Sequence, residues 1–135
     1  SYWEGILMEH SLENHPRISP QTVIEVARFL TEEKGKDTVA LDLRPQGGFT
    51  DYFVLTTSRS EAHQRGLVRR LHEHLKELGI DPRQSHRRGE DVGWSLLDCD
   101  DLVIHLMSPS MREFYDLEKL WFESEELYRQ DEDQS

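Results

Sequence analysis

The chain has 135 residues, of which 36% are hydrophobic and 32% charged, a composition typical of a single folded domain. Its net charge of −11 disfavours binding led by nucleic-acid phosphates, because such binding depends on basic side chains. No apolar run reaches the roughly 20 residues that span a bilayer, so we expect no membrane segment.

Residues 1–18 lack a clear hydrophobic period and are expected to form an N-terminal extension. Met8 could be the natural start, in which case part of the extension would be foreign to the natural protein. The segment carries Glu4 and Glu9 and lacks a basic region followed by a long apolar one, so neither a signal nor a transit peptide is expected. A single cysteine, Cys99, excludes an internal disulfide and suits the reducing cytoplasm.

The first regular element is expected to be a helix that begins after Ser19, because serine caps helices and Pro20 suits the first position. Apolar residues then recur at helical spacing until the helix ends near 34–35: Val23, Val26, Ala27 and Leu30. Two β-type runs follow at 38–43 (TVALDL) and 51–57 (DYFVLTT). The second run is apolar on both faces, which predicts a central strand.

Ser60 is expected to cap a second helix that ends at Gly79, with one apolar stripe made of Leu67 or Val68, Leu71, Leu75 and Leu78. The polar stretch 81–93 has room for a short edge strand. A group of basic residues spans this region: Arg65, Arg69, Arg70, Lys76, Arg83, Arg87 and Arg88. Because the whole chain is acidic, we interpret this group as a solvated helix face and loop and not as an RNA-binding patch.

Two short β-type runs, 94–98 and 102–107, are joined by a turn at 99–101 and predict a hairpin. A last helix should begin at Ser108 and Pro109, with a capping box at Ser110 and Glu113 one turn further in. One face of that helix should carry Met111, Phe114, Leu117 and Trp121. The acidic tail beyond Phe122 is expected to fray.

The element order predicts an α/β fold with a mixed β-sheet flanked by helices in a single domain. The expected boundaries are an N-terminal extension at 1–18, the domain at 19–122 and an acidic C-terminal tail at 123–135.

The run WSLLDCDDLVIHLM at 94–107 places three carboxylates near a histidine, which raises the question of a metal or acid–base site. A strand rises about 3.3 Å per residue, so His105 should lie roughly 13 Å along from Asp101 and on the side of Val103 and Met107. The acidic neighbours of Cys99 disfavour a thiolate nucleophile. No nucleophile elbow and no Gly-rich phosphate loop is present. The residues therefore predict no enzyme, no metal site and no cofactor.

The same residues leave two interpretations of Trp94 open. It could anchor a protein interface, since Trp is enriched among interface hot spots, or it could pack in the core. His105 suits a structural role in the middle of a strand. The residues alone predict an α/β domain whose hairpin could bind a partner.

The run 94–105, followed by 112–121, closely resembles the ribosomal silencing factor family (RsfS, also called Iojap or YbeB). Members of that family carry W-x-x-x-D-x-x-D-(apolar)₃-H and then R-x-(F/L)-Y-x-L-E-x-L-W. The resemblance extends to 51–57, Ser60 and His63, and covers roughly residues 20–122. This chain departs from the pattern at 56–59, where a glycine of the family's T-G-T-S turn is missing, and at Asp100, where the family usually has glycine.

The resemblance implies a nucleotidyltransferase-like fold without known enzymatic activity. It implies binding to the large ribosomal subunit through its ribosomal protein fourteen, which blocks the small subunit sterically and represses translation when nutrients are short. Contact with rRNA would be incidental, and the free protein could form a homodimer. Two alternatives stay open: a large-subunit assembly factor without silencing, and an enzyme that resembles nucleotidyltransferases.

The resemblance also implies site residues. We expect the docking surface to consist of Trp94, Leu97, Asp98, Cys99, Asp101, His105 and Met107, supported by Arg112, Tyr115 and Glu118. Trp94 would enter a pocket of the partner, and Asp98 and Asp101 would face its Lys or Arg side chains.

Overall fold

The computed structural model describes residues 18–47, 50–87, 93–115 and 124–131. The chain forms α2 (Pro20–Glu32), β1 (Lys36–Asp42), the 3₁₀ turn η1 (Arg44–Gln46), β2 (Tyr52–Thr57), α3 (Glu61–Glu77), β3 (Gln84–Arg87), β4 (Trp94–Asp98), β5 (Leu102–Met107), α4 (Pro109–Phe114) and β6 (Glu125–Arg129). Most of the predicted extension 1–18 lies outside these ranges. Within them, no helix has the length and apolar character needed to cross a membrane.

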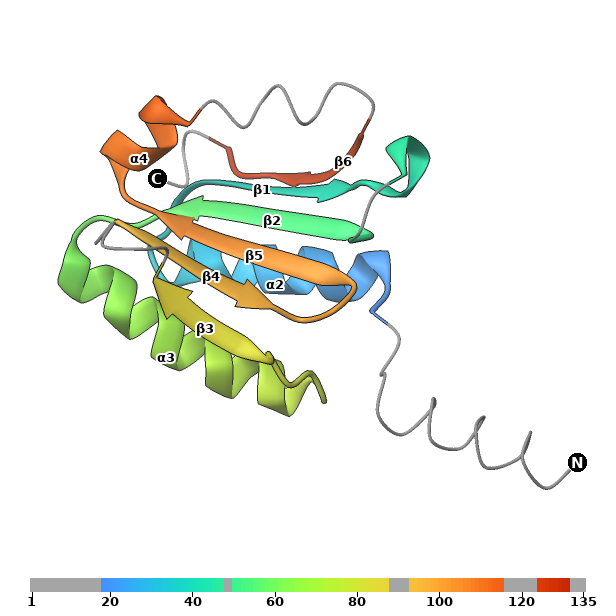
Figure 1. Cartoon of the computed structure of the whole chain (residues 1–135), viewed down its shortest axis with the longest axis horizontal. Helices are drawn as coiled ribbons and strands as arrows, with labels where there is room; N and C mark the ends of the chain where they lie inside the picture. The colour runs from blue at the N-terminus through green and yellow to red at the C-terminus, as the bar shows by residue number, and fades with distance from the viewer. Residues whose placement is uncertain (1–17, 48–49, 88–92, 116–123, 132–135) are drawn as a thin grey trace, which may run out of the picture.

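The strands form one sheet in the order β3-β4-β5-β2-β1-β6, shown in Figure 1. The β2–β5 pair is parallel, and the other neighbours are antiparallel. β2 is buried along its whole length, which confirms the prediction of a central strand. The predicted α/β fold with a mixed sheet and flanking helices is confirmed.

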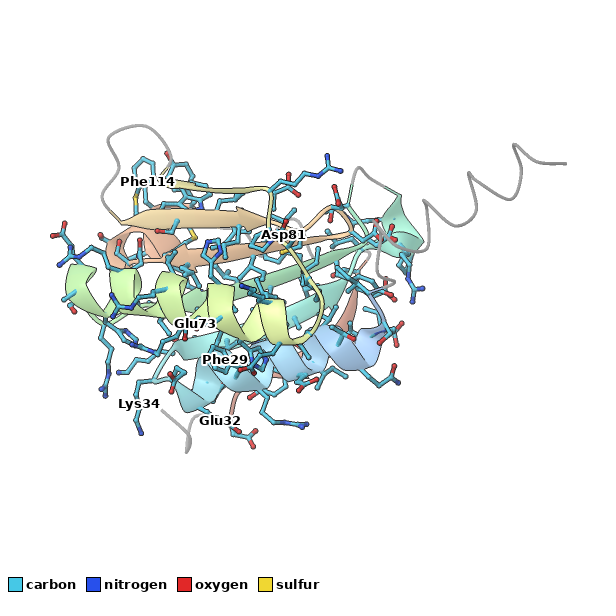
Figure 2. The ribbon with its side chains drawn as sticks, turned by 90° about the horizontal axis from the view of Figure 1, so that it is seen from below. Phe29, Glu32, Lys34, Glu73, Asp81 and Phe114 are labelled. Carbon is cyan, nitrogen blue, oxygen red and sulfur yellow. The ribbon has the colours of Figure 1, made fainter. Side chains whose placement is uncertain are left out.

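Helices α2 and α3 cover one face of the sheet (Figure 2). Both begin where the sequence predicts, because the hydroxyl of Ser19 accepts a hydrogen bond from the amide of Thr22, and that of Ser60 accepts one from the amide of His63. Their apolar stripes pack against the strands in a core that includes Val23, Val26, Ala27, Leu30, Leu67, Leu71, Leu75, Val54, Leu97 and Ile104. Each fully buried Leu contributes roughly 2–3 kcal/mol to this layer.

The other face of the sheet carries a second cluster, made of Val39, Leu41, Phe53, Leu55, Trp94 and Met107. Helix α4 begins at Ser108 and Pro109 as predicted, and the Ser108 hydroxyl caps it by accepting from the amide of Met111. The capping box expected at Ser110 and Glu113 is wrong, because Ser108 already provides the cap. Within the described residues α4 ends at Phe114. The predicted positions Leu117 and Trp121 lie outside the described residues.

Two residues that were predicted to share one face of the last helix differ in burial, and the exposed one is Phe114. The residue is 78% exposed, whereas Met111 packs against the second cluster. The helix has only 6 residues, and Tyr115, directly after it, has extended backbone. Figure 2 shows Phe114 on the side of the sheet opposite α2 and α3.

The expectation that the chain frays beyond Phe122 is also wrong for Glu125–Arg129. These residues form β6, which pairs antiparallel with β1 and covers the edge of that strand. The strand is held at its end by Gln130, whose side-chain Oε1 accepts from the amide of Thr38 at 2.9 Å and whose amide donates to the Thr38 carbonyl. Unpaired backbone groups of a strand edge favour such pairing even where the added segment is acidic.

Candidate functional site

The predicted hairpin is confirmed, and its side chains alternate between the two faces of the sheet. β4 and β5 pair antiparallel, with Trp94 opposite Met107 and Leu96 opposite His105. Trp94 and Met107 belong to the cluster on the face that α2 and α3 leave uncovered, hereafter the open face. His105 lies there as well, because its ring contacts Trp94 and Phe53, in agreement with the face predicted for it.

Two of the predicted docking residues lie on the helix-covered face instead. Leu97 is completely buried and Cys99 is 4% exposed, and both pack in the core beneath α2 and α3. Because strand neighbours point to opposite sides, neither side chain can share a surface with Trp94. Met107 does lie on the open face but is also completely buried. A partner could not touch these three side chains in the folded protein.

An aromatic row links the open face of the sheet to α4. It runs through Phe53, His105, Trp94, Tyr115 and Phe114, with ring centroids 4.7, 5.8, 4.9 and 4.9 Å apart in that order. Phe53 is 6% exposed, His105 is partly buried and Trp94 is 5% exposed, and exposure then increases to 37% at Tyr115 and 78% at Phe114. The row therefore begins in the core and ends at solvent.

One hydrogen bond fixes the centre of the aromatic row. Trp94 Nε1 donates to His105 Nδ1 at 3.0 Å. Since Nδ1 accepts, a neutral His105 carries its proton on Nε2. This geometry corrects the expected role of Trp94. A side chain that is 5% exposed cannot enter a pocket of a partner, so Trp94 serves as a rigid base under Tyr115, and Tyr115 and Phe114 present the accessible rings.

The turn of the hairpin holds its carboxylates in fixed places. Asp98 Oδ1 accepts from the amide of Asp100 at 3.0 Å, and Asp100 adopts a φ of 67°. This left-handed conformation favours glycine, which is the residue the family pattern usually has there. Arg83 Nε lies 3.3 Å from Asp100 Oδ1, and Asp101 is exposed. Asp101 also joins the turn to β2, because its carbonyl accepts from the amides of Asp51 and Tyr52.

Cys99 is chemically quiet in this turn. Burial, together with the nearby carboxylates of Asp98, Asp100 and Asp81, raises the pKa of its thiol to about 12. The thiolate is the reactive form of cysteine, so the native thiol is a poor nucleophile. The raised thiol pKa agrees with the prediction that the acidic neighbours of Cys99 disfavour its thiolate.

The position of α4 depends on close contacts beneath it. A Cβ atom on Gly93 would lie 2.4 Å from Ser108 Oγ, so the absence of a side chain there lets the cap of α4 approach β4. The Ser108 amide donates to the Gly93 carbonyl at 2.7 Å. Arg112 Nη1 donates to Thr57 Oγ1 at 2.9 Å and to the Lys36 carbonyl at 3.3 Å, which ties α4 to β2 and β1. Glu118, the third predicted supporting residue, lies outside the described residues.

A buried polar network that the sequence did not reveal holds the other face of the hairpin. Gln64 on α3 donates from Nε2 to Ser58 Oγ at 2.9 Å and to the Gly93 carbonyl at 3.3 Å. Its Oε1 accepts from Ser95 Oγ at 2.8 Å. The segment at 56–59, where the family's glycine is missing, is therefore held by side chains. Its last amide, that of Arg59, donates to His63 Nδ1 at 2.9 Å.

The geometry offers little for catalysis. Among the residues that the structure describes, no three His, Cys, Asp or Glu side chains group in a way that could hold a metal ion. His105 is occupied by Trp94, and Cys99 is protonated and buried. Exposed aromatic rings are features of a protein-binding surface, and here they lie at the end of the hairpin opposite its acidic turn.

Comparison with known proteins identifies the family. A sequence model described as "Ribosomal silencing factor during starvation" matches residues 16–135. The chain is 34% identical over 94 residues to the ribosomal silencing factor RsfS of Chromobacterium violaceum, covering 68% of this chain and 75% of that protein. It is 35% identical over 96 residues to the Mus musculus protein named mitochondrial assembly of ribosomal large subunit protein 1, covering 69% of this chain and 42% of that protein.

Solved structures show the same fold. A crystal structure of a Chromobacterium violaceum protein superposes with a TM-score of 0.67 at 31% identity, covering 77% of this chain and 87% of that one. A Bacillus halodurans protein gives a TM-score of 0.62 at 27% identity, covering 75% and 94%. The match to the family over residues 16–135 and the 34% identity to the Chromobacterium protein show that the chain belongs to the ribosomal silencing factor family.

Proposed function

We propose that this protein binds the large ribosomal subunit through its ribosomal protein fourteen and prevents the small subunit from joining. The observation that carries the proposal is the exposed end of the aromatic row. Phe114 and Tyr115 are exposed to solvent and in contact with each other. Tyr115 packs on Trp94, whose indole is fixed by its hydrogen bond to His105. Aromatic side chains held rigidly lose little conformational freedom on binding, which suits them to anchor an interface.

Charge supports a basic protein partner. Asp98 and Asp101 lie in the hairpin turn, and the whole chain carries −11. Such carboxylates mainly raise the rate of encounter and set the register with Lys or Arg on the partner, while the aromatic anchors hold the complex. The same net charge repels rRNA, so contact with it would be incidental.

The proposed mechanism is occlusion and involves no catalytic step, metal or cofactor. A domain seated on ribosomal protein fourteen would occupy space that the small subunit needs, and translation would fall in proportion to the bound fraction. We place this action in the cytoplasm, where the single buried thiol of Cys99 would meet no oxidising conditions.

A joining assay tests the proposal. Purified large and small subunits are mixed with increasing amounts of the protein, and full ribosomes are measured by sucrose-gradient sedimentation. We expect full ribosomes to decline and the protein to co-sediment with large subunits. The double variant Phe114→Ala/Tyr115→Ala should need at least about tenfold more protein, since hot-spot aromatics contribute on the order of 2 kcal/mol each.

The matched control is Lys76→Ala/Glu77→Ala, which removes two exposed side chains from α3 without changing the net charge. It should behave as the wild type does. Full inhibition by the aromatic double variant would show that the aromatic row is not the docking surface. Failure of the wild type to co-sediment would overturn the function itself.

Large-subunit assembly is a second candidate function. The Mus musculus relative is named for assembly of the mitochondrial large subunit, and the chain spans 42% of its length. Depleting the protein from its host would separate the two functions. Incomplete large subunits that accumulate while mature ones join normally would support assembly, whereas excess joining under starvation would support silencing.

We also propose that the free protein pairs through the same rings. Light scattering during size-exclusion chromatography should then give a dimer for the wild type and a monomer for Phe114→Ala/Tyr115→Ala. A wild-type monomer at every concentration would contradict the pairing and leave the docking role intact.

A further inference from the structure

A cleft of about 690 Å³ lies where α2 ends and β1, β6 and the turn between β2 and α3 meet. It is at the β6 edge of the sheet, whereas the hairpin strand β4 lies toward the opposite edge. Figure 2 shows Glu32 and Lys34, two of its lining residues, on the helix side of the sheet, opposite Phe114. The cleft and Phe114 therefore lie on opposite sides of the sheet, and nothing in the joining mechanism uses the cleft.

Positive charge is concentrated in this cleft. Its lining includes five basic residues against two acidic ones, Glu32 and Asp131, in a chain whose net charge is −11. The five are Arg28, Lys34, Lys36, Arg59 and Arg129. Arg129 forms an ion pair with Glu126. Within the described part of the chain, the other four form no ion pair with a carboxylate. Like charges that face one concave space repel each other, and a polyanion would relieve that repulsion.

The backbone conformation of Lys34 also supports a functional role for this cleft. Lys34 has a φ of 74°, the left-handed conformation that helix ends usually assign to glycine. Its amide donates to the Thr31 carbonyl, as expected for such an end. A lysine at this position is less favourable for folding than glycine would be. Strain of this kind is often found where the side chain itself has a function, here as a cation at the cleft.

Direct contacts join the walls of the cleft. Tyr128 Oη donates to Thr31 Oγ1 at 2.9 Å, which joins β6 to α2. A Cβ on Gly35 would lie 2.3 Å from Thr56 Oγ1, so the chain is tightly packed behind the lining. A preformed polar cleft of this volume falls in the range that accommodates a nucleotide-sized ligand.

We infer that this cleft binds the polyphosphate group of a small molecule, such as a nucleoside triphosphate. Four cations without an ion pair among the described residues line one recess, and they come from α2, the α2–β1 turn, β1 and the β2–α3 turn; this arrangement suits several phosphates close together. A continuous RNA strand fits less well, because it would have to leave the recess across a surface of strongly negative net charge. The inference does not depend on ribosome binding.

Calorimetric titration of the full chain tests the inference. The probes are ATP, inorganic pyrophosphate, adenosine and a single-stranded RNA oligonucleotide, each in magnesium-free buffer of low ionic strength. We expect ATP and pyrophosphate to bind one site and adenosine to give no heat. Affinity should fall as salt is added, because the attraction is between charges at an open site.

Two charge-reversal variants locate the site. Arg28→Glu/Arg59→Glu changes two exposed lining residues and should weaken ATP binding by more than about tenfold. Arg65→Glu/Arg69→Glu makes the same change in net charge at exposed positions of α3 outside the cleft. It should keep the affinity within about twofold. Equal weakening by both variants would mean that only the overall charge matters, and would overturn the inference.

Lys34→Gly separates binding from folding. Glycine suits the backbone conformation at this position, so the variant should melt at the wild-type temperature or above it while its ATP affinity falls severalfold. Unchanged affinity in this folded variant would remove Lys34 from the site. Absence of heat with both ATP and pyrophosphate, or tight binding of the RNA oligonucleotide alone, would show that the cleft is not a small-molecule polyphosphate site.

Discussion

The two faces of the β4–β5 hairpin are made from alternate residues of the same strands, yet they differ in what they can contribute to function. The helix-covered face is closed, with Leu97, Ile104 and Leu106 completely buried. The open face passes from buried Trp94 to exposed Phe114 through a chain of ring contacts. A partner can therefore reach only one face. Substitutions on the closed face should change stability alone, and substitutions on the open face should change docking as well.

The largest effect is expected from Leu97→Ala, at a position that the sequence assigned to docking. Removing a completely buried Leu should lower the free energy of unfolding by about 3 kcal/mol, from lost burial and the cavity left behind. Urea denaturation measures this change. Leu96→Ala is the matched control, because Leu96 is only partly buried and should cost less than half as much. Large-subunit binding per folded molecule should be normal in Leu97→Ala; a loss there would place Leu97 in the docking surface.

The next effect tests the polar network on the closed face. Gln64→Leu keeps the side-chain volume but leaves the Ser95 hydroxyl without its acceptor and the Ser58 hydroxyl without the amide that donates to it. Unpaired buried polar groups should reduce the free energy of unfolding by about 2 kcal/mol. Gln21→Leu, at an exposed position of α2, should stay within about 0.5 kcal/mol of the wild type. Equal stability of the two variants would mean that water replaces Gln64 in the network.

Features that depend on residues close together in the sequence, such as helix starts, could be predicted from it. Ser19 with Pro20, Ser60, and Ser108 with Pro109 each cap the helix that follows, and the caps alone place the helix starts. Strand alternation likewise predicted the face of His105. It could not predict which face the helices cover, because that depends on contacts between elements far apart in the chain. Leu97 was grouped with Trp94 because of the family resemblance, whereas strand alternation by itself places two residues three positions apart on opposite faces, as the structure has them.

Features that are built from segments far apart in the sequence could not be predicted, for the same reason. β6 is held by a bond between residues 92 positions apart, Thr38 and Gln130, and its own sequence is acidic with little alternation. The cationic cleft draws its basic side chains from three helical or turn segments and two strands, so no basic run marks it. The basic group on α3 was noticeable in the sequence, yet it lies outside the cleft.

Trp94→Phe, on the open face, is expected to have a smaller effect on the free energy of unfolding than the two closed-face variants. Trp94→Ala is a poor docking test, because removing a ring that is 5% exposed would disturb the fold as well. Phenylalanine keeps an aromatic base under Tyr115 but loses the bond from Nε1 to His105 Nδ1. The free energy of unfolding should drop by about 1 kcal/mol, and large-subunit binding should weaken severalfold.

A double-mutant cycle with His105→Phe checks that this loss belongs to the hydrogen bond. The coupling between positions 94 and 105 in urea denaturation should be about 1 kcal/mol, because each single variant already removes the bond. Coupling near zero would mean that the two side chains act separately. The open face would then owe its rigidity to ring packing alone.

The smallest effect concerns Cys99, at the turn where the two faces meet. Burial raises the pKa of its thiol to about 12 in the folded protein, from an ordinary value of 9.0. The folded state therefore keeps a proton that the unfolded state releases, so this contribution is complete well below pH 9 and is lost as the pH rises toward 12. Relative to Cys99→Ala, wild-type protein should lose about 0.4 kcal/mol of unfolding free energy between pH 7 and pH 9. Parallel pH profiles for the two proteins would show that the native thiol ionises as readily as an exposed one, and the turn would then be open to solvent on the closed face.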